Sequence, residues 1–60
     1  MKIRLIADRC NGTGGYTEGK IYKIFDESEI NYFLYDDDDD LRYINKTLKG
    51  NFYDWEIVEE

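Results

Sequence analysis

The chain has 60 residues, of which 14 are acidic and 8 basic, and its formal net charge of −6 disfavours nucleic acid or anionic lipid and favours a basic partner. A chain of this length forms one domain, over residues 1–60, that buries only roughly 60% of the surface of the unfolded chain. A single cysteine excludes an internal disulfide and the absence of histidine disfavours a zinc site, so six Tyr, three Phe and one Trp must supply the packing.

The N-terminal half predicts two strands separated by a glycine-rich loop. Residues 2–8 alternate apolar and polar side chains, which is the period of a half-buried strand. Residues 9–19 contain four glycines and no periodicity, so they predict a long, mobile loop. Residues 20–26 (KIYKIFD) are rich in β-branched and aromatic residues and predict a second strand. No apolar stretch is long enough for a signal peptide or a transmembrane segment, so we expect a cytoplasmic protein.

Residues 30–35 predict a third strand in which both faces are largely apolar. One candidate inward set is Tyr32 and Leu34. The other is Phe33 and Tyr35, and the sequence leaves both open.

An acidic hairpin tip follows this third strand. Residues 36–40 lack the glycine that a two-residue turn prefers, so we expect a loop of roughly three to five residues. Residues 41–45 predict a fourth strand, residues 46–51 a single helical or 3₁₀ turn, and residues 53–58 a last strand.

Five short strands, one long early loop and a short 3₁₀ turn before the last strand predict an all-β fold, a small closed or partly closed barrel. In a chain of this size each strand is expected to bend and to serve both halves of the barrel. A three-helix bundle is the alternative. It fits less well, because the charged residues do not alternate at helical spacing with a continuous apolar stripe.

Three segments in this order resemble the small SH3-like barrel proteins of phages and prophages of Gram-positive bacteria. They are EGKIYKI at residues 18–24, the acidic hairpin tip at residues 36–40 and WEIV at residues 55–58. The resemblance covers nearly the whole chain and implies a five-stranded SH3-like barrel. It also implies an accessory protein that binds a macromolecule of the host or the phage.

Five consecutive aspartates form the most distinctive feature of the chain. They are Asp36, Asp37, Asp38, Asp39 and Asp40. Adjacent like charges repel one another and are costly to bury, so the run must lie in water or be neutralised by positive groups. It is either a row of carboxylates that contacts Lys or Arg on a partner, or a solvated tip that keeps strand edges from pairing with other chains.

Two ligand patterns occur in the sequence, and neither predicts a cofactor. Residues 14–20 have the spacing GxxxxGK of a phosphate-binding loop, but Ile21 replaces the magnesium-binding Ser or Thr and a strand follows. Alternate aspartates in residues 36–40 match the start of a calcium loop, but Leu41 replaces the glycine and Thr47 the bidentate glutamate. Weak binding of a divalent cation by the carboxylates remains open.

The residues give little support to catalysis. Without histidine, Cys10 has only Arg9 beside it to activate the thiol, and solvated carboxylates lack the raised pKa that an acid catalyst needs. We therefore expect a protein that is not an enzyme.

Ten aromatic side chains exceed what so small a barrel can bury, so some of them must be exposed. We expect Tyr16, Tyr53 and one of Phe33 or Tyr35 to form an exposed patch. Together with the aspartates, this patch predicts an aromatic and anionic contact surface. The alternative is that these rings only cover the ends of the barrel.

The sequence thus predicts an acidic binding module that docks on a basic or nucleic-acid-handling host protein and inhibits it by occupying its surface. One alternative is a nucleic-acid-binding barrel that uses Lys20, Lys23, Arg42 and Lys46 on one face and stacks Tyr on bases. Another is a self-assembling virion component.

Overall fold

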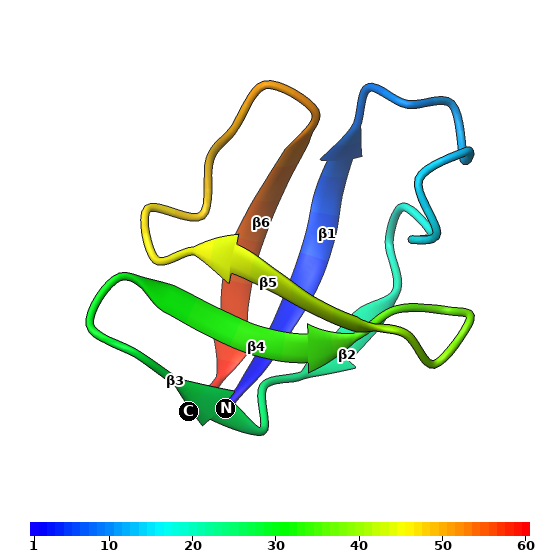
Figure 1. The fold of residues 1–60 in the computed structure, drawn as a ribbon. Coiled ribbons are helices and arrows are strands. Elements are labelled where there is room, and N and C mark those ends of the chain that lie inside the picture. The colour runs from blue at the N-terminus through cyan, green and yellow to red at the C-terminus, as the bar shows by residue number, and fades with distance from the viewer.

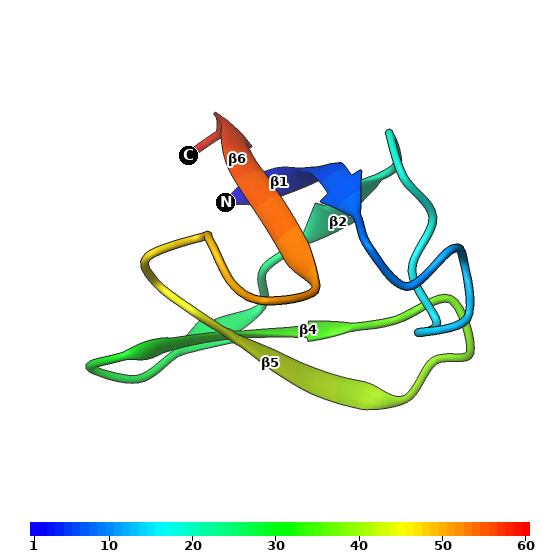
Figure 2. The ribbon, with the colours of Figure 1, turned by 90° about the horizontal axis from the view of Figure 1, so that it is seen from above.

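The computed structural model describes all 60 residues and contains six strands and no helix. The strands are β1 (Lys2–Asp8), β2 (Ile21–Lys23), β3 (Asp26–Glu27), β4 (Asn31–Tyr35), β5 (Leu41–Asn45) and β6 (Tyr53–Glu59). They form two three-stranded antiparallel sheets in the orders β2-β1-β6 and β3-β4-β5, whose strands cross in Figure 1 and lie in two layers in Figure 2. The predicted all-β class is confirmed, whereas the sheets do not close into a barrel. No helix capable of crossing a membrane is present.

The predicted second strand is divided between the two sheets, which is why six strands are present instead of five. Ile24 and Phe25 separate β2 from β3. The N–H of Ile24 still donates to the carbonyl of Met1 beside the first sheet, whereas the N–H of Phe25 donates to the carbonyl of Phe33 in the second. The chain therefore passes from one sheet to the other between these two residues.

The predicted 3₁₀ turn before the last strand is absent. Leu48 has a φ of 65°, which a right-handed helical turn cannot contain. A turn at residues 45–48 takes its place, with the N–H of Leu48 donating to the carbonyl of Asn45 at 3.0 Å. The carbonyl of Leu48 then accepts from the N–H of Trp55 at 2.8 Å, so this segment is held against the start of β6.

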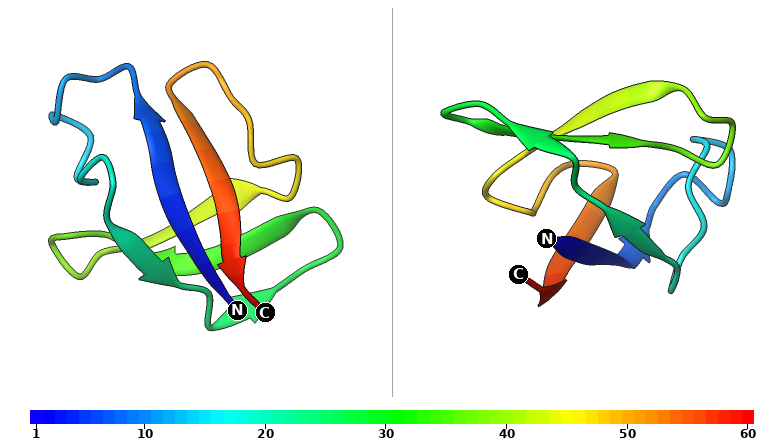
Figure 3. Two further views of the ribbon diagram at one scale, coloured as in Figure 1. Left: turned by 180° about the vertical axis from the view of Figure 1, so that it is seen from behind. Right: turned by 90° about the horizontal axis from the view of Figure 1, so that it is seen from below.

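β1 is the central strand of the first sheet. It pairs with β2 on one side and with β6 on the other, with Lys2 opposite Glu59 near the two ends of the chain. The N- and C-termini accordingly lie side by side in both views of Figure 3.

The core fills the space between the two sheets. Its eight buried side chains are Ile3, Leu5, Tyr16, Tyr22, Ile24, Tyr32, Leu34 and Trp55. Ile3, Leu5 and Leu34 have no exposed surface at all. The inward face of the third predicted strand is therefore Tyr32 with Leu34, which settles the choice that the sequence left open.

Tyr16 lies at the centre of this core, although the sequence predicted it to be exposed. Only 3% of its surface is accessible, and its ring makes edge contacts with the rings of Tyr22, Tyr53 and Trp55 at centroid distances of 5.4, 5.1 and 4.9 Å. The glycine loop folds back over the sheets and carries Tyr16 inward, because edge-to-face packing of rings stabilises the core of a small domain. Its hydroxyl oxygen is buried without a hydrogen-bond partner.

This unpaired hydroxyl gives a test of the core. We expect Tyr16→Phe to leave the free energy of unfolding unchanged or to raise it by up to about 1 kcal/mol, because no hydrogen bond is lost. Tyr16→Ala removes the ring and should lower it by about 3 kcal/mol or more. Urea unfolding followed by Trp55 fluorescence measures both. A large loss of stability in Tyr16→Phe would show that the hydroxyl has a partner.

Candidate functional site

The acidic turn at residues 36–40 joins β4 to β5 and lies against the glycine loop, residues 9–19 (Figure 1). Its length agrees with the predicted loop. Asp39 occupies the position of positive φ, at 60°, where a glycine would be usual, and aspartate tolerates this conformation better than most residues do. The N–H of Asp37 donates to the carbonyl of Gly15 at 2.8 Å, which joins the turn directly to the loop.

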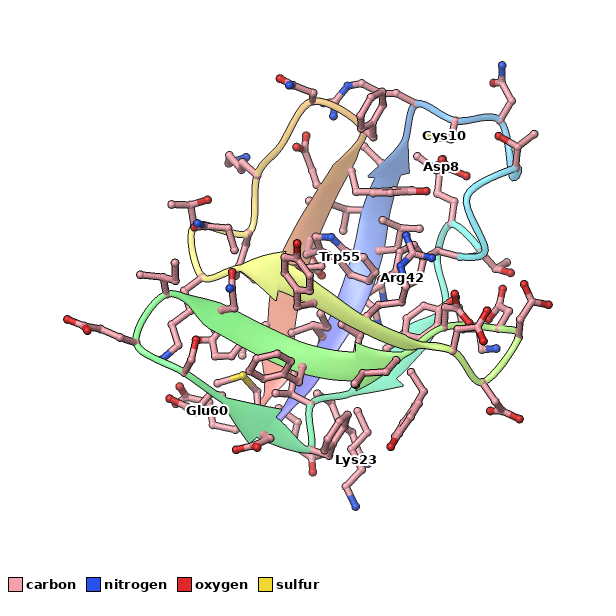
Figure 4. The ribbon with its side chains drawn as sticks, in the orientation of Figure 1. Asp8, Cys10, Lys23, Arg42, Trp55 and Glu60 are labelled. Carbon is pink, nitrogen blue, oxygen red and sulfur yellow. The ribbon has the colours of Figure 1, made fainter.

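Asp36 points inward and is only 6% exposed. Its Oδ1 accepts the N–H groups of Asp38 and Asp40 at 2.9 and 3.0 Å, and its Oδ2 accepts from the guanidinium of Arg42 at 2.8 Å. The same guanidinium nitrogen donates to the carbonyl of Gly14 at 3.0 Å (Figure 4 labels Arg42). One carboxylate thus shapes the turn and, through Arg42, fixes the glycine loop.

Asp37 forms a second set of contacts within the molecule. Its carboxylate accepts hydrogen bonds from Lys20 Nζ at 2.6 Å, Thr17 Oγ1 at 2.6 Å and the hydroxyl of Tyr22 at 2.8 Å. The hydroxyl of Tyr22 in turn accepts the N–H of Thr17. The loop predicted to be mobile is therefore held in place by the turn, because these residues bridge the two segments.

Both carboxylates are held in their charged form. The hydrogen bonds of Asp37 to Lys20 and then to Thr17 lower its pKa to about 2. Burial alone would raise the pKa of Asp36, but the N–H of Asp40 and the guanidinium of Arg42 outweigh burial and lower that pKa. These two aspartates are neutralised within the molecule, which is one of the two outcomes that the sequence allowed for the run, so they do not belong to the row of carboxylates that is free for a partner.

The other three aspartates of the turn have a different environment. Asp38, Asp39 and Asp40 are exposed, and none of them forms an ion pair within the protein. They are the part of the run whose charge faces solvent.

Internal pairing concentrates the net charge on unpaired carboxylates. Six of the eight basic side chains each pair with a different carboxylate, which leaves eight of the 14 carboxylates and two lysines unpaired. The pairs are Lys2–Glu59, Arg4–Glu56, Arg9–Asp54, Lys20–Asp37, Arg42–Asp36 and Lys46–Glu27. The unpaired lysines are Lys23, which Figure 4 places at the opposite end of the molecule from Cys10, and Lys49.

The alternate aspartates do not form a complete cation site. One carboxylate oxygen from each of Asp36, Asp38 and Asp40 lies within 4.8 Å of the others. Both oxygens of Asp36 are already bonded, one to backbone N–H groups and one to Arg42. Two free carboxylates are far fewer than the six to eight oxygens that calcium prefers, and the nearby guanidinium opposes a cation.

The glycine loop encloses an open, polar depression of about 610 Å³ between itself and the acidic turn. Four carboxylates line it, those of Asp8, Glu18, Asp37 and Asp38. Lys20, which would hold phosphate in a GxxxxGK loop, is instead bonded to Asp37. A depression lined by carboxylates repels phosphate, so the geometry opposes nucleotide binding as the sequence did.

Cys10 is half-buried nearby, and its N–H donates to Asp8 Oδ1.

The predicted aromatic patch is present only in part. Tyr16 is buried, Tyr53 is half-buried against Tyr16 and Trp55, and Tyr35 is 51% exposed. Burial raises the pKa of both Tyr16 and Tyr53 to about 12, so both phenols are neutral near pH 7. Tyr35 lies on the outer side of β4, away from the other two, so the three residues do not form one surface.

A larger aromatic surface, of which the sequence indicated only Phe33 or Tyr35, covers the outer side of the sheet β3-β4-β5. We call it the aromatic face. It consists of Phe25, Phe33, Tyr35, Leu41 and Tyr43. Its signal was present in the sequence, because β4 and β5 both have apolar residues at alternate outward positions. The antiparallel register that places Phe33 opposite Tyr43 could not be read from either strand alone.

Comparison with models of protein families, with curated proteins and with solved structures finds no match to this chain.

The ion pair between Asp36 and Arg42 should be essential for stability. Asp36→Asn keeps an oxygen for the two N–H groups but removes the charge, and we expect it to lower the Tm by about 10 °C. Arg42→Met should act similarly, and the double variant should lose less than the sum of the two. Thermal unfolding by circular dichroism measures these values. Asp38→Asn is the matched control and should leave the Tm within about 2 °C. Equal losses in Asp36→Asn and Asp38→Asn would contradict the pairing.

Asp37 should make the protein sensitive to acid. Because folding lowers its pKa from the ordinary 3.8 to about 2, its stabilising effect is complete above pH 3.8 and is lost as the pH falls through about 2. In Asp37→Asn we therefore expect the free energy of unfolding to depend less steeply on pH in this window. Asp39→Asn, which changes an exposed carboxylate and keeps a residue that tolerates positive φ, should retain the slope. Urea unfolding between about pH 2 and about pH 5 compares the variants. Identical slopes would refute the role of Asp37.

Proposed function

We propose that this protein is a small acidic binding module that docks on a basic protein surface and performs no catalysis. The observation that carries the proposal is the division of charge within the molecule. Six cations are used in internal pairs, and three adjacent carboxylates at the acidic turn remain free. The turn is held rigid by Asp36 and Asp37, so Asp38, Asp39 and Asp40 are presented with little loss of entropy on binding.

In this proposal the module is related to SH3-like small barrels, as an open form whose two sheets do not close. Two crossed three-stranded sheets, short strands and a strand that passes from one sheet to the other between Ile24 and Phe25 are consistent with that assignment. The resemblance of residues 18–24, 36–40 and 55–58 to phage and prophage proteins adds that the module is an accessory protein. In this proposal it acts in the host cytoplasm and inhibits a nucleic-acid-handling protein by covering its basic surface.

Nucleic-acid binding is the weaker alternative. It depends on Lys20, Lys23, Arg42 and Lys46 forming a basic face, but three of these side chains are paired with carboxylates of the same molecule. Binding of phosphates would require these pairs to break, and the net charge of −6 would oppose the approach. A self-assembling virion component is the third possibility, and light scattering at increasing protein concentration distinguishes it from a monomeric module.

The free carboxylates of the turn provide the test. The experiment captures basic proteins from a bacterial lysate on two immobilised proteins in parallel. One is the natural protein, and the other is the triple variant Asp38→Asn, Asp39→Asn and Asp40→Asn. We expect the natural chain to retain a basic protein at about 0.1 M salt and to release most of it at about 0.5 M, since surface charge pairs are screened by salt. The triple variant should capture little at either concentration. Asp36 and Asp37 are left unchanged, so the turn keeps its structure.

The control removes the same formal charge elsewhere, at Glu29→Gln, Glu59→Gln and Glu60→Gln, which are exposed and distant from the turn in sequence. Glu59 is the one member of this control in an ion pair, an exposed one with Lys2 that contributes little to stability. The control should capture nearly as much as the natural chain. Equal capture by the natural chain and by the triple variant would mean that the acidic turn is not the contact surface.

A further inference from the structure

The aromatic face covers the outer side of β3-β4-β5 with large side chains, four of them exposed and Phe33 half-buried. Tyr35 is 51% exposed, Leu41 63% and Tyr43 69%, whereas Phe25, at 47%, is stacked on Tyr35. The two strands bring these residues together in pairs, Phe33 opposite Tyr43 and Tyr35 opposite Leu41. Exposed apolar side chains that form one contiguous patch mark an interaction surface, whereas scattered ones need no explanation.

The rings are ordered by their own contacts. Phe25 and Tyr35 are nearly parallel, with centroids 4.8 Å apart and planes inclined by 14°, and Phe33 and Tyr43 lie 6.5 Å apart in a tilted pair. Phe25 is fixed further by its N–H, which donates to the carbonyl of Phe33. The ring surfaces are therefore arranged before any partner binds, which reduces the entropy lost on binding.

Within the sheet β3-β4-β5, the unpaired charges beside the aromatic face are all acidic. Asp26 lies directly opposite Phe33 in the register of β3 with β4, and it forms no ion pair. The acidic turn continues from the end of the face where Tyr35 pairs with Leu41. Arg42 is the one basic residue within β3, β4 and β5, and its side chain is bound to Asp36 on the inner side. The face offers rings and carboxylates, and no cation.

We propose that the aromatic face binds arginine side chains of the partner protein, an inference that rests on the proposed function and specifies its chemistry. A guanidinium is planar, stacks on aromatic rings and is more weakly hydrated than an ammonium, and it pairs with carboxylates at the same time. Tyr35 and Tyr43 supply exposed ring surfaces, and Asp26 and the acidic turn supply the carboxylates. Lysine pairs with the carboxylates but gains less from the rings.

Two other occupants fit the face less well. A second copy of this chain would bring another net charge of −6 and no unpaired cation on its own aromatic face, so carboxylates would face carboxylates. Bases of single-stranded nucleic acid stack on rings, but the phosphates beside them need positive groups that this face lacks. Arginine supplies both the flat surface and the positive charge.

The test compares an arginine-rich peptide with a lysine-rich peptide of equal length and charge, each labelled and titrated with the natural protein at low salt by fluorescence anisotropy. We expect tighter binding of the arginine-rich peptide by about fivefold to tenfold. The variant Tyr35→Thr with Tyr43→Thr keeps residues suited to strands and should weaken binding of the arginine-rich peptide by about tenfold, with little effect on the lysine-rich one. Phe52→Thr is the matched control. It removes an exposed ring, 61% accessible, outside the face and should change neither affinity.

Each outcome has a distinct meaning. Equal affinity for the two peptides, or an unchanged arginine preference in the tyrosine variant, overturns this inference and leaves the basic-partner proposal intact. Absence of binding to either peptide overturns both. If the natural protein binds labelled oligothymidylate and the tyrosine variant does not, the face belongs to nucleic acid and the inference is overturned. If the natural protein forms a dimer by light scattering and the tyrosine variant does not, the face belongs to a second copy, which also overturns the inference. Circular dichroism melting of each variant verifies that the fold is retained.

Discussion

The hydrogen-bonded ion pair between Asp36 and Arg42 lies across the β4-β5 hairpin and ties that hairpin to a loop that no strand pairing connects to it. It fixes the acidic turn, and through Gly14 it fixes the glycine loop. Arg42 also lies over the ring of Tyr16, 4.7 Å from its centroid, so the same side chain covers the centre of the aromatic core. A domain of this size without a disulfide depends on such contacts to hold a long loop, and those of Asp37 with Thr17 and Lys20 add to this ion pair. The core depends on the loop, because the loop supplies Tyr16, and the loop depends on the ion pair.

This arrangement resolves the repulsion that five adjacent aspartates create. Two of them bind cations of the same molecule and lie against the glycine loop, and the remaining three face solvent. The charge of the run is thereby divided between stabilising the fold and remaining available to a partner. The contact between the glycine loop and the acidic turn is close at Gly15. The φ of Gly15 is +89°, which residues with a side chain rarely adopt, and a Cβ atom at this residue would lie only 3.0 Å from Asp36 Oδ2, so a larger residue would be strained and would displace that carboxylate.

Alternation along the chain predicted the limits of most strands, because β1, β4 and β5 each have the side-chain period of a strand. The same alternation extends beyond β4, since Tyr32 and Leu34 point inward and the next position of the same parity is Asp36. An aspartate after a strand indicated a solvated turn, and only the position of Arg42 across the hairpin shows why it can be buried. The prediction that Tyr16 is exposed was wrong for a related reason. A loop without periodicity does not indicate which of its side chains point toward the core. Contacts outside the alternation of a single strand determined the positions of both residues, across the hairpin for Asp36 and with the aromatic core for Tyr16.

The outer sides of the two sheets carry different kinds of side chain, and this difference is the strongest argument that the aromatic face has a role in binding. Strands favour aromatic and β-branched residues at exposed positions too, so exposed rings alone could reflect strand propensity. That preference should act equally on both sheets. The sheet β2-β1-β6 does expose two β-branched residues, Ile6 and Ile21, as that preference predicts. Yet its outer side also carries charged pairs across its strands, Lys2 with Glu59 and Arg4 with Glu56, and no aromatic ring, whereas the outer side of β3-β4-β5 carries rings beside an unpaired Asp26. Propensity does not explain why one face is neutralised by its own charges and the other is left apolar and acidic. A partner that supplies both flat apolar surface and positive charge does.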